Sequence, residues 1–164
     1  MFTEHKRTVN KVNFHPTEGS LLVSASQDGS MSLFDVRSLN SVAHFMSNTE
    51  SIRDVQFNPH NQYQVASVSE HGKVQLWDCR RPDRWEKQWP GHSEHVFACE
   101  WHPEVRGWLA TAGRDKLVKV WDTLGNQRTV PFPDHIVHTI GPVGKVKWRP
   151  QRRDHLVRYF VLKW

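Results

Sequence analysis

The feature that most constrains this chain is a segment that recurs three times at nearly constant spacing. Its copies, SASQDGSMSLFD, SVSEHGKVQLWD and TAGRDKLVKVWD, end at Asp35, Asp78 and Asp122, which lie 43 and 44 residues apart. A second motif keeps the same phase, and its four copies read VNFHP, VQFNP, CEWHP and VKWRP. A period of roughly 40–45 residues is typical of the four-stranded blade of a β-propeller. The fourth copy of the second motif indicates that a further blade begins near residue 143.

Within each copy, apolar and polar residues alternate with the two-residue period of a β-strand, as Val118, Lys119 and Val120 illustrate. We therefore expect an all-β fold, an incomplete β-propeller of three blades plus the start of a fourth. The expected blades cover about 5–46, 48–90 and 92–133, with first strands near 9–14, 52–57, 96–101 and 143–148. Residues 1–150 would form this partial propeller and residues 151–164 a basic, divergent tail.

The two motifs resemble those of the WD40-repeat family, whose repeats have a Gly-His pair early in the unit and a Trp-Asp pair near its end. The third copy carries both pairs, as Gly91-His92 and Trp121-Asp122. The resemblance implies a WD40-type propeller with a buried, hydrogen-bonded tetrad in each regular blade. In the third blade the tetrad would consist of His92, Thr111, Asp115 and Trp121. A buried aspartate is tolerated only when it is hydrogen-bonded, so we interpret this set as structural.

The first and second blades depart from the family pattern to different degrees. The first keeps His5, Ser24 and Asp28 of the implied tetrad but has Phe34 in place of the tryptophan. The second has Asn48 at the histidine position and His71 at the aspartate position. We therefore expect the second blade to be the least rigid of the three.

Several longer segments go beyond what the repeat requires, among them FTEHKRTVNKV, VQLWDCRRPDRWE and RGWLATAGRDKLVKVWD. They resemble the WD-repeat subunits of the GATOR complex, the counterpart of the yeast SEA complex. The resemblance implies a scaffold that binds other protein subunits of that complex. It also implies a cytoplasmic location at the lysosomal or vacuolar surface and a role in amino-acid signalling to TOR complex 1. Three and a fraction blades leave faces and strand edges uncovered, so we further expect self-association or binding of another blade.

Catalytic, metal and cofactor sites are not expected. The sequence contains neither a GxxxxGK[ST] nor a GxGxxG phosphate-binding motif, and its His, Asp and Ser sets are accounted for by the tetrads. His92, His95 and Cys99 lie close in sequence, but no second ligand pair follows at zinc-finger spacing. Cys99 takes a position that valine fills in the other copies, and Cys79 takes one that Val36 fills, so both indicate packing. We predict a non-enzyme that needs no cofactor.

Two alternative functions depend on basic residues. Arg37 and Arg80 each follow an aspartate by two residues, and with Arg81 they resemble the WDxR element of receptors that bind the cullin-4 ubiquitin-ligase adaptor. Arginine at this place also commonly forms a local ion pair. The net charge of +5 is concentrated in residues 145–164, where seven basic residues face one acidic residue. This tail would support only weak, salt-dependent nucleic-acid binding. No stretch is apolar enough to predict an integral membrane span.

Overall fold

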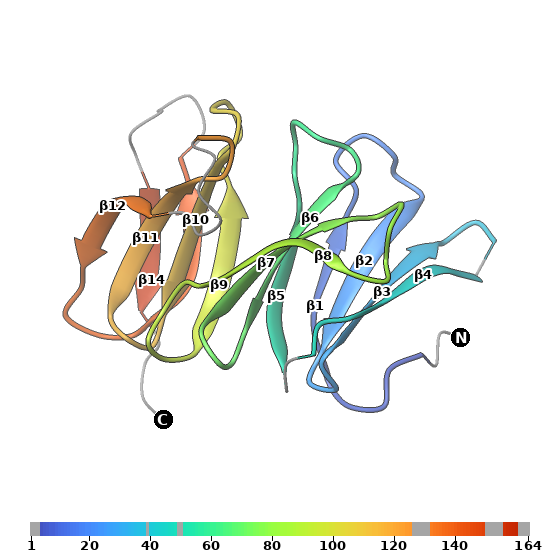
Figure 1. Ribbon diagram of the computed structural model, residues 1–164, viewed down its shortest axis with the longest axis horizontal. Helices are drawn as coiled ribbons and strands as arrows, with labels where there is room; N and C mark the ends of the chain where they lie inside the picture. Colours follow the sequence, from blue (N-terminus) through green and yellow to red (C-terminus); the bar gives the residue numbers. More distant parts are fainter. Residues whose placement is uncertain (1–3, 39, 49–50, 126–131, 150–155, 161–164) are drawn as a thin grey trace.

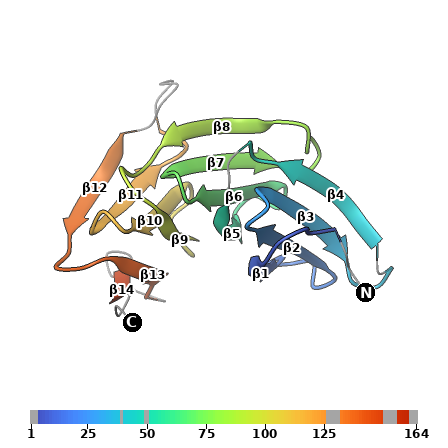
Figure 2. The same cartoon turned by 90° about the horizontal axis from the view of Figure 1, so that it is seen from below.

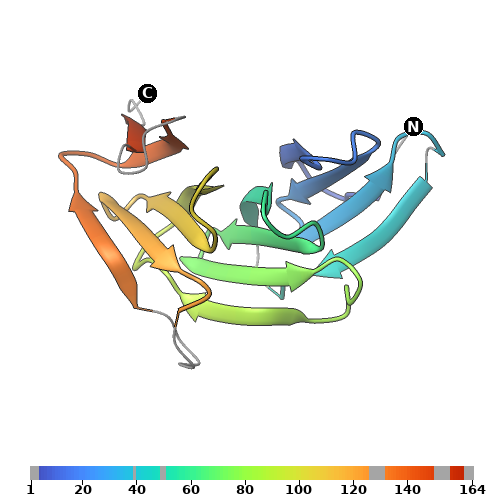
Figure 3. The ribbon, with the colours of Figure 1, turned by 90° about the horizontal axis from the view of Figure 1, so that it is seen from above.

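The computed structural model describes residues 4–38, 40–48, 51–125, 132–149 and 156–160. Its strands form three four-stranded sheets, blades 1 to 3, and one two-stranded sheet, the fourth-blade hairpin. The sheets follow one another along an arc, with each first strand on the inner side and each fourth strand on the outer side (Figures 1 and 2). Blade 1 and the fourth-blade hairpin lie at the two ends of the arc (Figure 3). This arrangement confirms the predicted all-β, incomplete β-propeller.

The order of strands repeats from blade to blade, and strands that are consecutive in sequence pair antiparallel. Blade 1 contains β1 (Val9–Phe14), β2 (Leu21–Ser26), β3 (Ser30–Asp35) and β4 (Asn40–Met46). Blade 2 contains β5 (Ile52–Phe57), β6 (Gln64–Ser69), β7 (Lys73–Asp78) and β8 (Trp85–Pro90). Blade 3 contains β9 (Val96–Trp101), β10 (Trp108–Gly113), β11 (Leu117–Asp122) and β12 (Pro133–His138). The fourth-blade hairpin contains β13 (Val143–Trp148) and β14 (Leu156–Phe160).

Three apolar cores hold the arc together, one at each junction between successive sheets. At the first two junctions, the tryptophan that closes the third strand of one blade packs against the blade before it. The Trp77 ring lies 5.7 Å from that of Phe45, and the Trp121 ring lies 5.6 Å from that of Trp89, measured between ring centroids. Edge-on aromatic contacts of this kind add to the free energy gained from burying the rings. The second and third strands of blade 2 are therefore almost entirely buried, because a sheet covers them on each face.

The inner strands of neighbouring blades are also linked by hydrogen bonds at one repeated position. Asn13 Oδ1 accepts from the Phe57 amide at 3.1 Å, and the Gln56 carbonyl accepts from Trp101 Nε1 at 3.2 Å. At the third junction, a Glu100 carboxylate oxygen accepts from the Trp148 amide at 2.8 Å. Asn13, Gln56 and Glu100 occupy the same place in their repeats, just before the aromatic residue of the second sequence motif. A hydrogen bond at this repeated position therefore links each inner strand to the next.

The turns between second and third strands depend on backbone conformations that few residues adopt. Gly29 and Gly72 have φ angles of 79° and 75°, and Lys116 takes the same role in blade 3 with a φ of 64°. The Gly72 carbonyl accepts hydrogen bonds from the Gly91 and His92 amides, which joins this turn to the start of blade 3. A Cβ atom on Gly72 would lie 2.1 Å from the His92 carbonyl oxygen, so only glycine fits there.

The inner strand of blade 1 differs from its counterparts in exposure. Val12 and Phe14 are 48% and 58% exposed, whereas Val55 and Phe57, at the same positions of blade 2, are 0% and 5% exposed. In blade 2 these side chains pack against the sheet before it. Val12 and Phe14 therefore present an apolar surface of the kind that receives a preceding blade, here called the open face of blade 1.

The fourth-blade hairpin extends into the segment that the sequence indicated as a tail. β14 pairs antiparallel with β13, from Trp148 opposite Leu156 to Val143 opposite Phe160. The sequence indicated only the first of these strands, because residues after Pro150 carry no turn aspartate or Trp-Asp pair. The rest of the expected tail, residues 151–155 and 161–164, lies outside the described residues.

Candidate functional site

The structure brings the four residues of the blade 3 tetrad into one hydrogen-bonded chain. Trp121 Nε1 donates to Thr111 Oγ1 at 2.8 Å, and Thr111 Oγ1 lies 2.7 Å from His92 Nε2. His92 Nδ1 lies 2.9 Å from both carboxylate oxygens of Asp115. A ring that carries its proton on Nδ1 donates to the carboxylate and accepts from the threonine hydroxyl at Nε2. Every polar atom of this chain thus has a partner, as burial requires.

Electrostatics keep the Asp115 carboxylate charged. Burial by itself would raise the pKa of Asp115, because a low-dielectric environment disfavours the anion. Hydrogen bonding and electrostatic attraction from His92, together with the amides of Leu117 and Ser93, outweigh burial and bring the pKa below its ordinary value of 3.8. The carboxylate therefore anchors the turn between β10 and β11 to the first residues of blade 3.

Blade 1 holds the three tetrad residues that its sequence contains. His5 Nε2 lies 2.5 Å from Ser24 Oγ, and His5 Nδ1 lies 3.4 Å from an Asp28 carboxylate oxygen. Ser30 adds a contact absent from the sequence pattern, because its hydroxyl donates to Asp28 at 2.6 Å. Phe34 is buried at the place of the tryptophan, and its ring has no N–H group to donate to Ser24. Burial raises the pKa of Asp28, but the Ser30 hydroxyl and the Lys6 and Ser30 amides bring it well below its usual range.

Blade 2 replaces the missing histidine with a residue that sequence reasoning did not single out. Asn48 and His71 are both exposed, and the buried Gln75 reaches the space between Ser67 and the start of the blade. Trp77 Nε1 donates to Ser67 Oγ at 3.0 Å, and Gln75 Oε1 lies 3.5 Å from that hydroxyl. Gln75 Nε2 donates to the Ser47 carbonyl at 2.9 Å. The only sequence signal was an amide side chain at a strand position that carries Ser32 and Lys119 in the other blades.

Arg37 and Arg80 turn back onto the aspartate of their own turn. Arg37 Nη2 lies 3.1 Å from Asp35, and Arg80 Nη2 lies 2.7 Å from Asp78. The Arg81 amide donates to the Asp78 carbonyl at 2.9 Å, and its side chain is exposed. Local ion pairs therefore engage both guanidinium groups. This geometry gives no support to a cullin-adaptor contact, and the partner-binding role of these arginines stays a prediction.

The thiols and histidines are arranged for packing and structural hydrogen bonding. Burial raises the pKa of Cys79 to about 12 and that of Cys99 well above its usual value, so both thiols are un-ionised at neutral pH. His95 Nδ1 donates to the Glu70 carbonyl of blade 2 at 2.5 Å, which separates it from the tetrad that contains His92. Among the described residues, no group of three or more His, Cys, Asp or Glu side chains could hold a metal ion.

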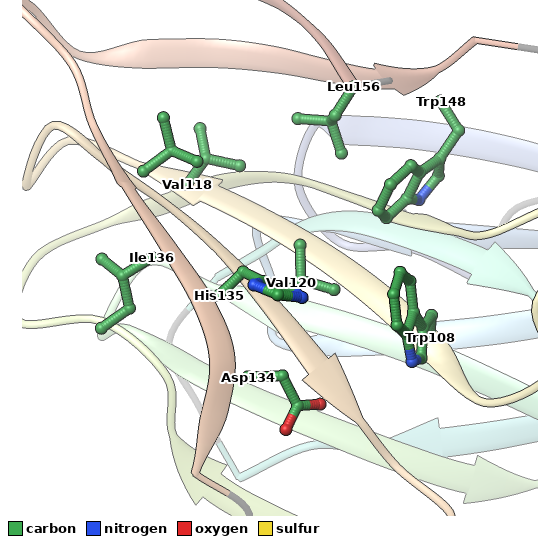
Figure 4. A pocket seen from close by; sticks show the side chains of 9 residues that line it. Trp108, Val118, Val120, Asp134, His135, Ile136, Trp148 and Leu156 are labelled. Atoms are coloured by element: carbon green, nitrogen blue, oxygen red, sulfur yellow. The ribbon is translucent and has the colours of Figure 1, made fainter. Parts of the chain in front are cut away.

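A cavity of about 570 Å³ lies between blade 3 and the fourth-blade hairpin (Figure 4). Val118 and Val120 of β11 form one wall, and the indole rings of Trp108 and Trp148 lie 6.3 Å apart beside them. His135 of β12 reaches the Trp108 ring, with 5.8 Å between the centroids. The lining is largely apolar, so the cavity is suited to burying a side chain.

The basic residues near the C-terminus are only partly described. Lys147 forms an ion pair with Glu100 of blade 3, and Lys145 and Arg149 are exposed. Arg152, Arg153 and Lys163 lie outside the described residues. The nucleic-acid hypothesis therefore stays a prediction. In the part of the chain that the structure describes, no helix is long and apolar enough to cross a membrane.

The repeated sheets and their hydrogen-bonded corners define a β-propeller protein. Residues 2–160 match the family described as NUP159/214 beta propeller, and the chain belongs to this family. Among individual proteins, it is similar to the GATOR2 complex protein WDR24 of Homo sapiens, with 56% identity over 156 residues. That alignment covers 95% of this chain and 19% of the human protein. The WD40-type repeat and the likeness to a WD-repeat subunit of the GATOR complex that the sequence indicated are confirmed.

More distant relatives show the same partial coverage. The GATOR2 complex protein Wdr24 of Drosophila melanogaster is 47% identical over 156 residues, which are 95% of this chain and 20% of that protein. Restriction of telomere capping protein 1 of Candida albicans (strain WO-1) is 33% identical over 160 residues, which are 90% of this chain and 14% of that protein. The chain thus spans about a fifth or less of the length of the curated relatives it matches.

Proposed function

We propose that this chain is a non-catalytic propeller scaffold that contributes to a GATOR2-type complex by binding other protein subunits. The observation that carries the proposal is the 56% identity, over 95% of the chain, to a protein named as a GATOR2 complex protein. In line with the sequence resemblance, the complex would act in amino-acid signalling to TOR complex 1 at the cytoplasmic face of the lysosome or vacuole.

The side-chain chemistry supports a binding role. The tetrad residues of blades 1 and 3 are held in hydrogen-bonded sets inside the sheets. A general base must reach a substrate, and His92 instead has both ring nitrogens bonded to Asp115 and Thr111. The open face of blade 1 is an apolar surface that another sheet can cover, and the cavity beside Trp108 can accept a side chain of a partner.

Affinity capture followed by mass spectrometry tests the proposal. The tagged chain, expressed in cells, should recover subunits of the GATOR2 complex that the tag alone does not recover. An Arg37→Gln/Arg80→Gln double variant should recover the same subunits, because both guanidinium groups already pair with Asp35 and Asp78. Recovery of the cullin-4 adaptor in place of GATOR2 subunits, lost in the double variant, would overturn the proposal in favour of the ubiquitin-ligase alternative.

A further inference from the structure

The cavity between blade 3 and the fourth-blade hairpin, here called the junction cavity, lies at a place that is filled at the two earlier junctions. At those junctions, the later blade contributes residues of its first strand, one residue of its second strand and the tryptophan that closes its third strand, Trp77 or Trp121. At the third junction, β13 and Leu156 of β14 supply the first two parts. Among the described residues, none takes the place of the closing tryptophan.

The walls of the junction cavity correspond to the residues that hold a closing tryptophan at the earlier junctions. Phe45 of β4 and Trp89 of β8 are the outer-strand residues that the tryptophan rings contact. In β12 the strand register puts Val137 at the same place, opposite Val118. Phe45 and Trp89 are each 1% exposed, whereas Val137 is 39% exposed and lines the cavity with Val118 and Val120 (Figure 4). The surface that a closing ring would cover is therefore present and uncovered.

Beside the junction cavity, β14 offers an open backbone edge. In blades 2 and 3, the strand with the closing tryptophan pairs antiparallel with the second strand, where Trp77 lies opposite Val65 and Trp121 opposite Leu109. Leu156 occupies the same place in β14. In the part of the chain that the structure describes, β14 pairs with β13 alone. An extended segment that adds to such an edge gains backbone hydrogen bonds, and neighbouring pockets select its side chains.

We propose that the junction cavity binds a bulky aromatic side chain, a tryptophan or a phenylalanine, on a β-strand of a partner protein that pairs with the open edge of β14. The cavity volume of about 570 Å³ leaves room for an indole ring. The ring would cover Val118, Val120 and Val137, as the closing tryptophans cover their counterparts in blades 1 and 2. The inference rests on the proposed function, since it takes the chain to bind other proteins.

A second copy of this chain is a less suitable source of the ring than a separate partner. Its closing aromatic residues, Phe34, Trp77 and Trp121, are 3%, 0% and 2% exposed, and their strands each have a neighbouring strand on both sides. A copy would have to open a blade to donate one of them. Phe14 is exposed on the edge strand β1, so a second copy that inserts Phe14 is the alternative that the experiment must exclude.

Fluorescence anisotropy with the purified chain tests the junction cavity. The probe is a labelled peptide with the sequence of residues 113–123, GRDKLVKVWDT, which contains β11 and its closing tryptophan. Two matched peptides carry phenylalanine or serine in place of that tryptophan. The tryptophan peptide should bind at least about tenfold more tightly than the serine peptide, because the cavity removes the ring from water. The phenylalanine peptide should lie between them.

Hydrogen exchange distinguishes the addition of a strand from non-specific adhesion of an apolar peptide. Bound tryptophan peptide should slow exchange of the backbone amides of β14 and leave those of β4 unchanged. The edge strand β4 is the matched control, because it also pairs with a single strand among the described residues. Binding without added protection in β14 would contradict the proposed pairing.

Two variants place the peptide in the junction cavity. Val137→Glu should weaken binding of the tryptophan peptide several-fold, because a charged group would line the cavity. Val42→Glu is the matched control at an exposed valine of β4 and should leave binding unchanged. Both positions are exposed, and urea unfolding should show that both variants remain folded.

Equal binding of the tryptophan and serine peptides, or equal weakening by Val137→Glu and Val42→Glu, would overturn the inference. Light scattering covers the alternative of a second copy. A dimer that both Phe14→Ser and Val137→Glu dissociate would place Phe14 of a second copy in the cavity and would also overturn the inference. Affinity capture of GATOR2 subunits is a separate readout, so either proposal can fail alone.

Discussion

Replacing Asp115 with alanine should destabilise the protein far more than the corresponding change in blade 2. The Asp115 carboxylate accepts from His92 Nδ1 and from the amides of Ser93 and Leu117, at 2.9, 3.3 and 3.2 Å. A hydrogen bond to a charged group contributes about 1.5–3 kcal/mol, and the two long amide contacts about 0.5 kcal/mol each. The substitution also strands His92 Nδ1, whose side chain is completely buried. We expect the free energy of unfolding to fall by about 3 kcal/mol.

His71→Ala is the matched comparison, because His71 takes the repeat position of Asp115 but is exposed. Its loss should be within about 1 kcal/mol, as for most surface substitutions. Urea unfolding followed by tryptophan fluorescence measures both variants, and Asp115→Asn, which keeps the side-chain shape, should lie between them. Equal losses for Asp115→Ala and His71→Ala would refute the idea that the hydrogen-bonded chain makes blade 3 more rigid than blade 2.

Three further predictions concern packing, acid and thiol chemistry. Phe57→Ala should lower the free energy of unfolding by about 3–5 kcal/mol, whereas Phe14→Ala, at the same repeat position but exposed, should lower it by less than about 1 kcal/mol. Light scattering should also show that Phe14→Ser reduces self-association. The lowered pKa values of Asp28 and Asp115 mean that their stabilisation is complete above about pH 5 and is lost as the pH falls through 4 and below. Acid titration should therefore show a shallower loss of stability in the Asp28→Asn/Asp115→Asn variant. The buried Cys99 should react with a thiol reagent at pH 8 only after unfolding, and rapid native labelling would contradict its burial.

The fold could be predicted from the sequence because the repeat indicates which positions of each blade are buried between sheets. Residues at one phase of a 43- or 44-residue period meet similar surroundings wherever another blade precedes theirs, so Val55 and Cys99 could be recognised as core residues without coordinates. Val12 has the same phase but is exposed, because no described sheet lies before blade 1. The blade 3 tetrad could be named for the same reason. β14 could not be predicted, since a strand whose sequence departs from the repeat has only its pairing with β13 to define it.

Features that depend on compensation between blades were out of reach of the sequence. Gln75 replaces a missing histidine from a different strand, and nothing in its own position marks it as buried or bonded to Ser47. The contacts of Asp54 could not be predicted either, because its buried carboxylate forms an ion pair with Lys11 of blade 1 and accepts a hydrogen bond from the Cys99 amide of blade 3. Such contacts join residues 28 to 45 positions apart, and a periodic pattern shows which residues are equivalent but not which of them touch.

The hydrogen bonds that Asn13, Gln56 and Glu100 accept from the next inner strand bear on how propellers of this type change size during evolution. Each sheet meets the sheet before it through an apolar core and a hydrogen bond that recur with every unit. A duplicated repeat would therefore already contain the residues that join its sheet to the next one. The deletion of a repeat would leave the contacts between the remaining sheets unchanged. A substitution at this position would remove the contact where the acceptor is a side chain, as for Asn13 and Glu100, but would leave it in place where the acceptor is a backbone carbonyl, as for Gln56.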